Sequence, residues 1–242
     1  MTDRPSVALV TGAGHRLGRA FALAIAARGT RVAVHYNSAA DEARKTVDLI
    51  SDSGGTAAAF QSDLTRSDGP PALVDAVVRE MGGLDILVNS AAVMERTPFG
   101  DVSVTDWDRI FALNLRAPFF LAQAASKVMR KGSAIVNISD LAAFETWPAY
   151  IPHSISKAGV VRMTESLARV LGPDIRVNAI APGAVLLPAD WDEDQGKRFA
   201  ETTPLERIGD PSDAVGALLY LLDAPFVTGE TIVVDGGRRI RK

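Results

Sequence analysis

Short apolar runs alternate along the chain with longer stretches in which apolar residues recur at helical spacing. The runs hold about five residues, many of them β-branched, and show no polar alternation, which is typical of strands in a parallel sheet covered on both faces. Strands are expected at residues 7–10, 31–36, 56–60, 84–88, 134–138, 175–179 and 231–234. Helices are expected at residues 16–28, 39–53, 71–81, 105–131, 154–171 and 211–222. The alternation predicts an α/β fold, a Rossmann-type, doubly wound, seven-stranded parallel sheet with helices on both faces.

Residues 184–203 do not follow this alternation of predicted strands and helices. They contain Pro188, Trp191 and several acidic residues but no clear strand. Ligands of open α/β sheets bind beyond the carboxyl ends of the strands, and this segment follows such an end. We interpret it as a substrate-side lid, with a surface insertion as the alternative. The whole chain, residues 1–242, is expected to be a single domain, because one core can serve this length.

Composition narrows the function classes. The chain is 47% hydrophobic and 23% charged, as in ordinary globular proteins. Its net charge of -3 argues against a nucleic-acid partner, since phosphate binding needs a concentrated basic surface. The basic residues at the end of the sequence are expected to form a solvated tail: Arg238, Arg239, Arg241 and Lys242.

The chain has no cysteine, which excludes disulfides and thiolate metal sites, and we expect no metal site. No apolar leader follows Met1, and no stretch approaches the roughly 20 apolar residues of a membrane span. We therefore expect a cytoplasmic protein without a membrane partner.

A glycine-rich turn follows the first predicted strand and leads into the first predicted helix. It reads Thr11-Gly12-Ala13-Gly14-His15-Arg16-Leu17-Gly18. Glycines let the backbone approach a pyrophosphate closely, and a helix N-terminus offers unpaired amides and the positive end of a dipole. The turn is therefore predicted to bind a dinucleotide through Gly12, Gly14, His15, Arg16, Leu17 and Gly18.

Further motifs follow in a fixed order along the chain: Asn89-Ser90-Ala91, Asn114, Asp140, His153, Lys157, Pro182-Gly183 and Asp235-Gly236-Gly237. With the turn, they make the chain resemble the short-chain dehydrogenases/reductases over essentially its whole length. Arg16 stands where most of that family has a second turn glycine, and Asp140 stands at the position of the catalytic serine. Both substitutions resemble the pteridine reductase branch.

The resemblance implies further cofactor contacts. Asp63, in Ser62-Asp63-Leu64, stands where an acidic residue of the family contacts adenine, and Asn89 ends the fourth strand beside the cofactor. Helix capping or turn formation is the alternative role of both side chains. The implied cofactor site also includes Leu64, Ser90, Ala91, Lys157, Pro182 and Gly183.

The end of the second strand bears on the choice of cofactor. NAD selectivity usually comes from an acidic residue there, which binds the ribose 2′-hydroxyl and repels a 2′-phosphate. This chain has His35-Tyr36-Asn37-Ser38, with no carboxylate before Asp41. Neutral donors at Asn37 and Ser38, with the guanidinium of Arg16, favour a phosphate, so NADP(H) is the expected cofactor. The alternative is that Arg16 only pairs with a surface carboxylate.

The catalytic positions contain one departure from the family. The family's Tyr-x-x-x-Lys pair, which the i, i+4 spacing places on one helix face, reads His153-Ser154-Ile155-Ser156-Lys157 here. Asp140 stands thirteen residues before His153, as the family's spacing requires. Asn114 matches the asparagine that supports the lysine through water. The resemblance therefore implies Asn114, Asp140, His153 and Lys157 as catalytic residues, without the tyrosine.

Three interpretations of this departure remain open. An imidazole titrates near neutral pH, so His153 is able to donate the proton in an NADPH-dependent reduction, with Asp140 orienting it or the substrate. Alternatively, Tyr150 donates the proton from the preceding loop, although Tyr150 and Trp147 could equally line a pocket for a flat substrate. In the third interpretation chemistry is lost, and the protein is an NADP-binding regulatory or structural relative.

The resemblance implies reduction of a small-molecule carbonyl or imine, with a pterin and a 3-oxoacyl thioester or other ketone as alternative substrates. It also implies a homo-oligomer, with a tetramer favoured, through the helices at residues 105–131 and 154–171. Their apolar residues exceed what one face against a sheet requires. Phe99, Trp107 and Phe111 are interpreted as core or interface aromatics.

Overall fold

A seven-stranded parallel sheet forms the centre of the computed structural model, which describes residues 6–185 and 192–240. The strand order is β3-β2-β1-β4-β5-β6-β7, and every neighbouring pair is parallel. The predicted Rossmann-type fold is thus confirmed. The strands are β1 Val7–Val10, β2 Arg31–Tyr36, β3 Ala57–Gln61, β4 Ile86–Asn89, β5 Ser133–Ile138, β6 Ile175–Pro182 and β7 Thr231–Val234.

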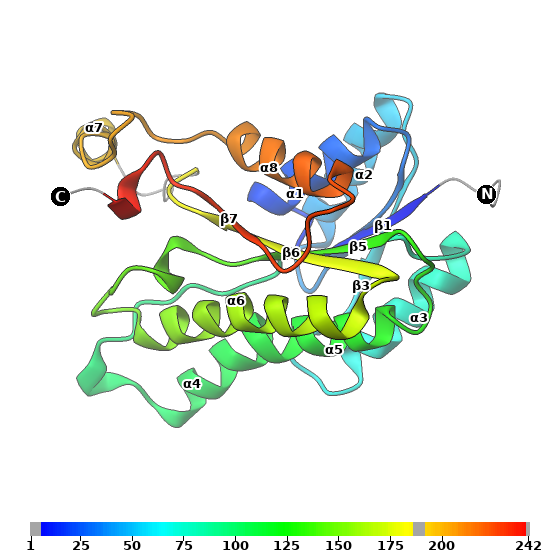
Figure 1. The fold of residues 1–242 in the computed structure, drawn as a ribbon, viewed down its shortest axis with the longest axis horizontal. Coiled ribbons are helices and arrows are strands. Elements are labelled where there is room, and N and C mark those ends of the chain that lie inside the picture. Colours follow the sequence, from blue (N-terminus) through cyan, green and yellow to red (C-terminus); the bar gives the residue numbers. More distant parts are fainter. Residues whose placement is uncertain (1–5, 186–191, 241–242) are drawn as a thin grey trace.

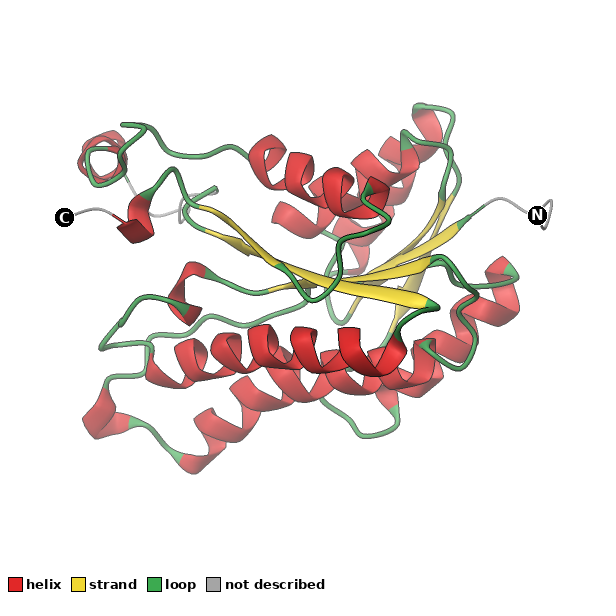
Figure 2. Ribbon diagram, in the orientation of Figure 1, coloured by secondary structure: helices red, strands yellow, loops and turns green. Residues whose placement is uncertain are grey.

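Helices cover both faces of this sheet (Figures 1 and 2). One layer contains α1 (Arg16–Ala26), α2 (Ala40–Asp52) and α8 (Pro211–Asp223). The other contains α3 (Gly69–Met81), α5 (Ala117–Ala125) and α6 (Ile151–Leu171). The remaining described helical segments are α4 Val104–Phe111, α7 Glu193–Ala200, η1 Phe99–Asp101, η2 Ala112–Arg116, η3 Leu141–Ala143 and η4 Arg238–Ile240.

Each helical layer encloses its own hydrophobic core. In β1, Val7 and Leu9 belong to the core under α3 and α5, whereas Ala8 and Val10 belong to the core under α1, α2 and α8. All four side chains are fully buried. Because successive strand side chains point to opposite faces and both faces are covered, the strand needs an apolar residue at every position.

The long helix predicted at residues 105–131 differs from the structure in its middle and at its end. It consists of α4, a π-helical segment, η2, and α5, which ends at Ala125. Pro118 lies in the first turn of α5 and has no N–H to donate to the carbonyl of Asn114 four residues earlier. This missing bond explains why the regular helix is widened at η2, where Asn114 lies.

The start of α6 departs from the sequence prediction by one helical turn, and α7 is an additional helix. The helix expected from residue 154 begins at Ile151, with Pro152 in its first turn, where a missing N–H costs nothing. The helix α7 was not predicted at all. Its signal is the capping box, in which the Asp192 carboxylate accepts from the Gln195 amide at 2.7 Å and the Gln195 side chain accepts from the Asp192 amide at 2.8 Å.

Candidate active site

A cavity of about 960 Å³ lies at the carboxyl ends of the strands. The chain runs from β1 to β3 toward one edge of the sheet and from β4 to β7 toward the other, so β1 and β4 form the switch point at which such a fold binds ligands. Residues that follow β1 to β6 line the cavity, as do side chains of α6, α7 and η4. Of the predicted site residues, the cavity wall contains Gly12, Gly14, His15, Arg16, Leu17, Gly18, Asn37, Ser38, Asp63, Leu64, Ser90, Ala91, Asp140, His153, Lys157, Pro182 and Gly183.

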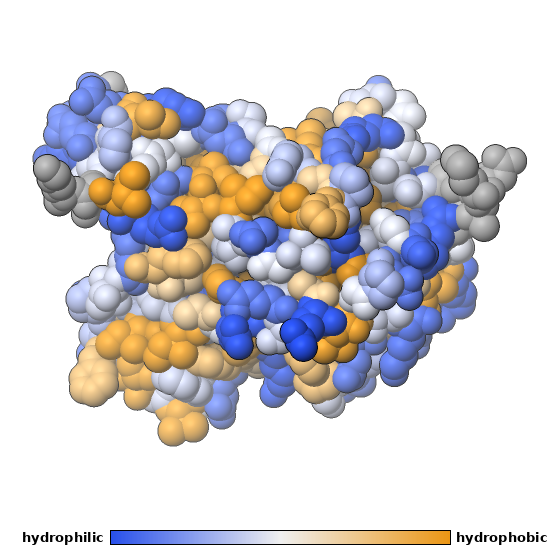
Figure 3. All heavy atoms as spheres, in the orientation of Figure 1, coloured by the Kyte–Doolittle hydropathy of each residue, from blue (hydrophilic) through white to orange (hydrophobic). Residues whose placement is uncertain are grey.

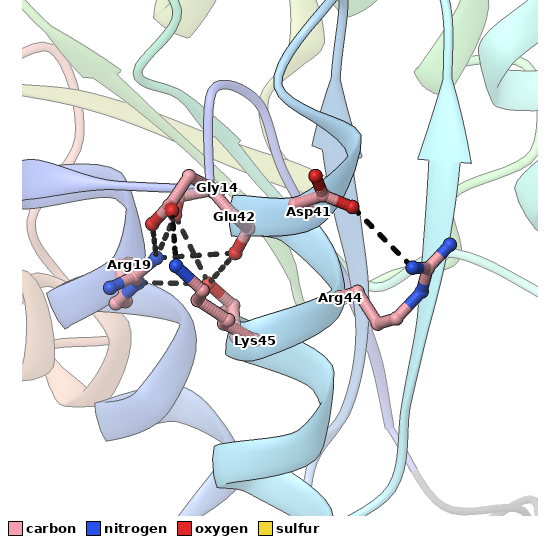
Figure 4. A network of polar contacts seen from close by, with 7 residues as sticks. Gly14, Arg19, Asp41, Glu42, Arg44 and Lys45 are labelled. Carbon is pink, nitrogen blue, oxygen red and sulfur yellow. Dashed lines mark hydrogen bonds and ion pairs between the residues drawn. The ribbon is translucent and has the colours of Figure 1, made fainter.

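The glycine-rich turn is held from outside the cavity by α1 and α2 (Figure 4). The Arg19 guanidinium donates to the carbonyl of Gly14 and to the Glu42 carboxylate, the latter at 2.7 Å. The Thr46 hydroxyl lies 3.1 Å from the carbonyl of Ala13. These side chains engage the carbonyls of the turn, so the fold itself sets the shape of the turn.

Two glycines of the turn have no room for a side chain. Gly12 has a φ of +65°, and a Cβ there would lie 3.0 Å from the Cα of Ala91. A Cβ on Gly18 would collide with the carbonyl oxygen of Gly12. Arg16 has a φ of +51°, so it keeps the left-handed backbone of the glycine that the family usually has at this position.

His35 supports the turn from β2, a role that no sequence motif indicated. Its Nδ1 accepts from the Gly12 amide at 3.1 Å, and its Nε2 donates to the Ser62 carbonyl at 3.0 Å. Burial lowers the pKa of His35 to about 4, so the imidazole is neutral at pH 7 with its proton on Nε2. The available signal was a polar ring inside an otherwise apolar buried strand beside the turn.

Side chains after β2 define the end of the cavity at which a cofactor's 2′ position is expected. Asn37 and Ser38 line it together with Arg16. The nearest carboxylates along α2 have cationic partners, since Asp41 pairs with Arg44 at 3.4 Å and Glu42 with Arg19 and Lys45 (Figure 4). This arrangement is compatible with a bound phosphate.

The Asp63 and Asn89 predictions have different outcomes. Asp63 lines the cavity, where its Oδ1 accepts from the amide and hydroxyl of Thr65 at 2.9 and 2.6 Å, and these bonds lower its pKa. Asn89 does not line the cavity and is buried. It faces Asn137 across the β4–β5 ladder, and its Nδ2 donates to Asn137 Oδ1 at 2.8 Å. Asn89 therefore joins two strands through Nδ2, while its Oδ1 has no hydrogen-bond partner among the described residues. The cofactor contact of Asn89 stays a prediction.

Lys157 and Asp140 both line the cavity. Lys157 is 4% exposed, and its Nζ donates to the carbonyl of Ile138 at 2.8 Å. Burial lowers the pKa of Lys157 to about 8, an effect that the nearby charge of Asp140 opposes. Asp140 caps η3 with Oδ1, which accepts from the Ala142 amide at 2.8 Å, and this bond leaves Oδ2 on the side of His153.

His153 is 1% exposed and lies one helical turn before Lys157 on α6. Its Nδ1 donates to the carbonyl of Val93 at 3.1 Å, which fixes the orientation of the ring. Its Nε2 lies 3.7 Å from Asp140 Oδ2 and makes no hydrogen bond to any residue within the described ranges. The ring therefore presents one uncommitted nitrogen beside a carboxylate in a cavity wall.

Asn114 lies behind this ring and does not line the cavity. Its Oδ1 accepts from the Val93 amide and its Nδ2 donates to the Val93 carbonyl, both at 2.9 Å. Nδ2 also donates to the Ser156 hydroxyl at 3.2 Å. The described contacts of Asn114 thus hold the segment that orients His153, and none of them is to Lys157.

Aromatic side chains and one arginine line another part of the cavity. Trp147 and Tyr150 pack edge to face with ring centroids 6.1 Å apart, and Phe199 comes from α7. Arg238 lines the same cavity with a side chain that is only 15% exposed, so its assignment to a solvated tail was wrong. The turn formed by Asp235-Gly236-Gly237 directs η4 back toward α7, and it is this turn that brings Arg238 inside.

The predicted lid lies partly outside the described residues, including Pro188 and Trp191. Its described remainder contains α7, and whether the segment closes over a substrate stays a prediction.

Among the described helices, none has the length and apolar character of a membrane span. The cytoplasmic location also stays a prediction.

Comparison with known proteins agrees with the fold and the motifs. A family model described as enoyl-(acyl carrier protein) reductase matches residues 12–239. The chain is 36% identical to 3beta-hydroxysteroid dehydrogenase 1 of Eggerthella lenta over 95% of this chain and 92% of the relative. It is 34% identical to the 3-oxoacyl-[acyl-carrier-protein] reductase of a Synechocystis strain over 96% of both chains.

The chain is also similar to a solved structure over nearly its whole length. FolM alternative dihydrofolate reductase 1 from Brucella canis, complexed with NADP, superposes with a TM-score of 0.92 at 32% identity, covering 98% of this chain and 95% of that one. The motifs, the sheet order and these full-length matches lead to one conclusion. The chain belongs to the short-chain dehydrogenase/reductase family.

Proposed function

We propose that the protein is an NADPH-dependent reductase of a carbonyl or imine compound and that His153 supplies the proton. The observation that carries the proposal is the Nε2 atom of His153. This atom is buried, lies 3.7 Å from Asp140 and makes no hydrogen bond to a described residue, and it belongs to a side chain that lines the cavity. An orphaned buried nitrogen costs free energy unless it gains a partner, and a bound substrate is such a partner.

The cofactor part of the proposal rests on the fit of the turn. The glycine-rich turn lines the cavity and leads into the N-terminus of α1, which suits a pyrophosphate. Arg16, Asn37 and Ser38 line the same cavity and offer donors to a 2′-phosphate. Asp63 would contact the adenine end and Lys157 the nicotinamide ribose. The FolM structure, solved with NADP, supports the same choice. NADPH, when bound, supplies the hydride.

His153 is oriented for proton donation. Since Nδ1 already donates to Val93, a second proton on the ring must lie on Nε2, which faces Asp140. The Asp140 carboxylate lies 3.7 Å from this nitrogen. As the substrate carbon gains the hydride, the adjoining oxygen or nitrogen takes the Nε2 proton, and the neutral imidazole regains one from solvent.

The substrate class has support from two sides. The hydroxysteroid dehydrogenase and oxoacyl reductase names favour a ketone. FolM, together with Arg16 and Asp140, favours a pterin, in which a ring carbon-nitrogen bond would be reduced. A pterin amino group is able to donate to Asp140 Oδ2. Both classes belong to the same proposed chemistry, hydride to carbon and a proton to the heteroatom.

The decisive experiment is single-turnover oxidation of NADPH with 7,8-dihydrobiopterin, 7,8-dihydrofolate, 1-tetralone and an acetoacetyl thioester. With the substrate that turns over, His153→Phe is expected to be slower by roughly 100-fold to 10,000-fold, with unchanged NADPH affinity. His153→Tyr, which restores the family residue, should keep activity and move the pH profile. Tyr150→Phe is the matched control and should change the rate by less than about tenfold.

Two results would contradict the proposal. An unchanged rate in His153→Phe, together with a large loss in Tyr150→Phe, would show that Tyr150 of the loop donates the proton instead of His153. Tight NADPH binding without turnover of any substrate would favour the NADP-binding regulatory or structural protein instead.

We also propose a homo-oligomer, with a tetramer favoured, through α4, α5 and α6. Outward apolar side chains support this interface: Val104, Trp107, Phe119, Phe120, Ile155 and Val170. Figure 3 shows apolar surface over the region that η1 and α4 occupy in Figure 1. Phe99 is 81% exposed and so is not a core residue, and Trp107 stacks on Phe111 at 4.5 Å. Sedimentation velocity should give a species larger than 25.7 kDa.

A further inference from the structure

Arg238 is a cation placed in the wall of the catalytic cavity by the last described helical segment, η4. Its guanidinium carbon lies 4.1 Å from the centroid of the Phe199 ring. Its Nε is buried and makes no hydrogen bond to a described residue. Burial of an arginine with unused donors is costly, so a role for the charge is expected here.

The protein partners of this guanidinium use little of its donor capacity. The Glu145 carboxylate lies 3.6 Å from Nε, a distance at which charges attract but no hydrogen bond forms. Glu145 instead accepts from Trp147 Nε1 at 2.9 Å. The other polar contact to a described residue is a long one of 3.4 Å from Nη1 to the Thr202 hydroxyl. An arginine has five N–H donors in a planar fork, so this side chain can still bind an oxygen ligand.

Flat rings surround the same part of the cavity. Trp147 and Tyr150 contribute one wall, packed edge to face, and Phe199 contributes another. Aromatic walls favour planar ring systems through stacking. The cavity thus combines aromatic walls with a guanidinium, and it also contains the proton-donor position at His153.

We infer that Arg238 is a specificity-determining residue that binds a carboxylate on a planar aromatic substrate. A guanidinium matches a carboxylate bidentately, which a neutral acceptor cannot do. Glu145 acts as the internal counter-ion that keeps Arg238 paired before the substrate arrives. The inference rests on the proposed function, because it names the substrate class of that site, but ligand binding tests it without any turnover.

The test is calorimetric titration of 2-naphthoate and of uncharged 2-naphthamide into the full-length protein, with and without NADP⁺. Wild type is expected to bind the naphthoate at least about tenfold more tightly, the usual size of a hydrogen bond to a charged group. Arg238→Met, which keeps an apolar stem over Phe199, should reduce this preference to about twofold or less. Its NADPH affinity should stay unchanged.

Two further variants sharpen the test. Arg239→Met is the matched control, since Arg239 is the adjacent cation of η4, is exposed, stacks on Phe144 at 5.0 Å and does not line the cavity. It should keep the wild-type preference. Glu145→Gln should strengthen naphthoate binding, because the competing carboxylate is removed while an acceptor for Trp147 remains.

Equal affinity of wild type for naphthoate and naphthamide, or no binding of either, overturns the inference. So does an Arg238→Met protein that keeps the preference. If Arg238→Met does not fold, Arg238→Lys replaces it and should bind naphthoate more weakly than wild type but still in preference to naphthamide. A naphthoate preference without NADPH oxidation would retain the carboxylate site and reject only the reductase function.

Discussion

The two buried histidines of the cavity show how differently its two ends are built. His35, beneath the cofactor turn, uses both ring nitrogens, one toward Gly12 and one toward Ser62. His153, at the proposed catalytic end, has hydrogen-bond partners among the described residues at Nδ1 alone and keeps Nε2 beside Asp140. The cofactor end is bonded internally so that its shape is fixed. The proposed catalytic end keeps buried polar atoms without a hydrogen-bond partner among the described residues, and such atoms lower the stability of the folded protein.

Lys157→Met should cause the largest loss of activity at the proposed catalytic end. We expect turnover to fall by roughly 100-fold to 10,000-fold, while the melting temperature stays equal or rises, because a buried ammonium is removed. The unfolded lysine keeps its proton up to about pH 10.5 and the folded one only to about pH 8. Unfolding therefore takes up a proton in this window, and wild type gains stability as the pH rises from 8 to 10.5.

Denaturant unfolding of Lys157→Met across this pH range should lack that gain. A variant with a melting temperature several degrees below that of wild type would show that Lys157 is structural and would remove the contrast between the two ends.

His35 should make the stability of the folded protein decrease in acid. Its pKa is lowered from 6.5 to about 4 in the fold, so unfolding takes up a proton between these pH values and stability falls as the pH drops from 6.5 to 4. The loss is roughly 3 kcal/mol, at 1.36 kcal/mol for each pKa unit. Chemical denaturation of wild type and His35→Asn should show this slope in wild type alone. Equal slopes in both proteins would mean that other groups cause it.

Gly18→Ala tests the close packing of the turn. The new Cβ would collide with the carbonyl of Gly12, and we expect the free energy of unfolding to fall by about 2 kcal/mol, together with NADPH affinity. Gly216→Ala in α8 is the control, because no atom lies within 4 Å of its Cβ position and alanine should stabilise that helix slightly. Equal effects of both substitutions would contradict a tightly packed turn.

Arg16→Gly should have the smallest effect on stability. It separates the contribution of the backbone conformation at this position from that of the guanidinium charge. Glycine removes the cost of a left-handed φ of +51°, so stability should increase by about 1 kcal/mol. Loss of the guanidinium should reduce the preference for NADPH over NADH by about tenfold. Fluorescence titration with both cofactors measures the preference. No change in it would leave Arg16 with a backbone role only.

The fold and the cofactor turn were readable because their signals are local. Buried parallel strands need apolar residues at every position, and the glycine spacing follows from contacts within one strand-turn-helix unit, as at Gly12 and Gly18. The Asp140, His153 and Lys157 positions were found through motif spacing, and all three line one cavity. Helix ends were less readable, because Pro118 widens one helix and a capping box starts another.

The tertiary structure decided which atoms of these residues remain available. Nδ1 of His153 is bound by Val93, sixty residues away, and the amide of Asn89 by Asn137 on the next strand. Arg238 lines the cavity although the next residue, Arg239, is exposed. The sequence by itself determined the residue types and their approximate places. Only packing between distant segments fixed each side chain's direction and partners, because hydrogen bonds and burial depend on atoms that no local pattern specifies.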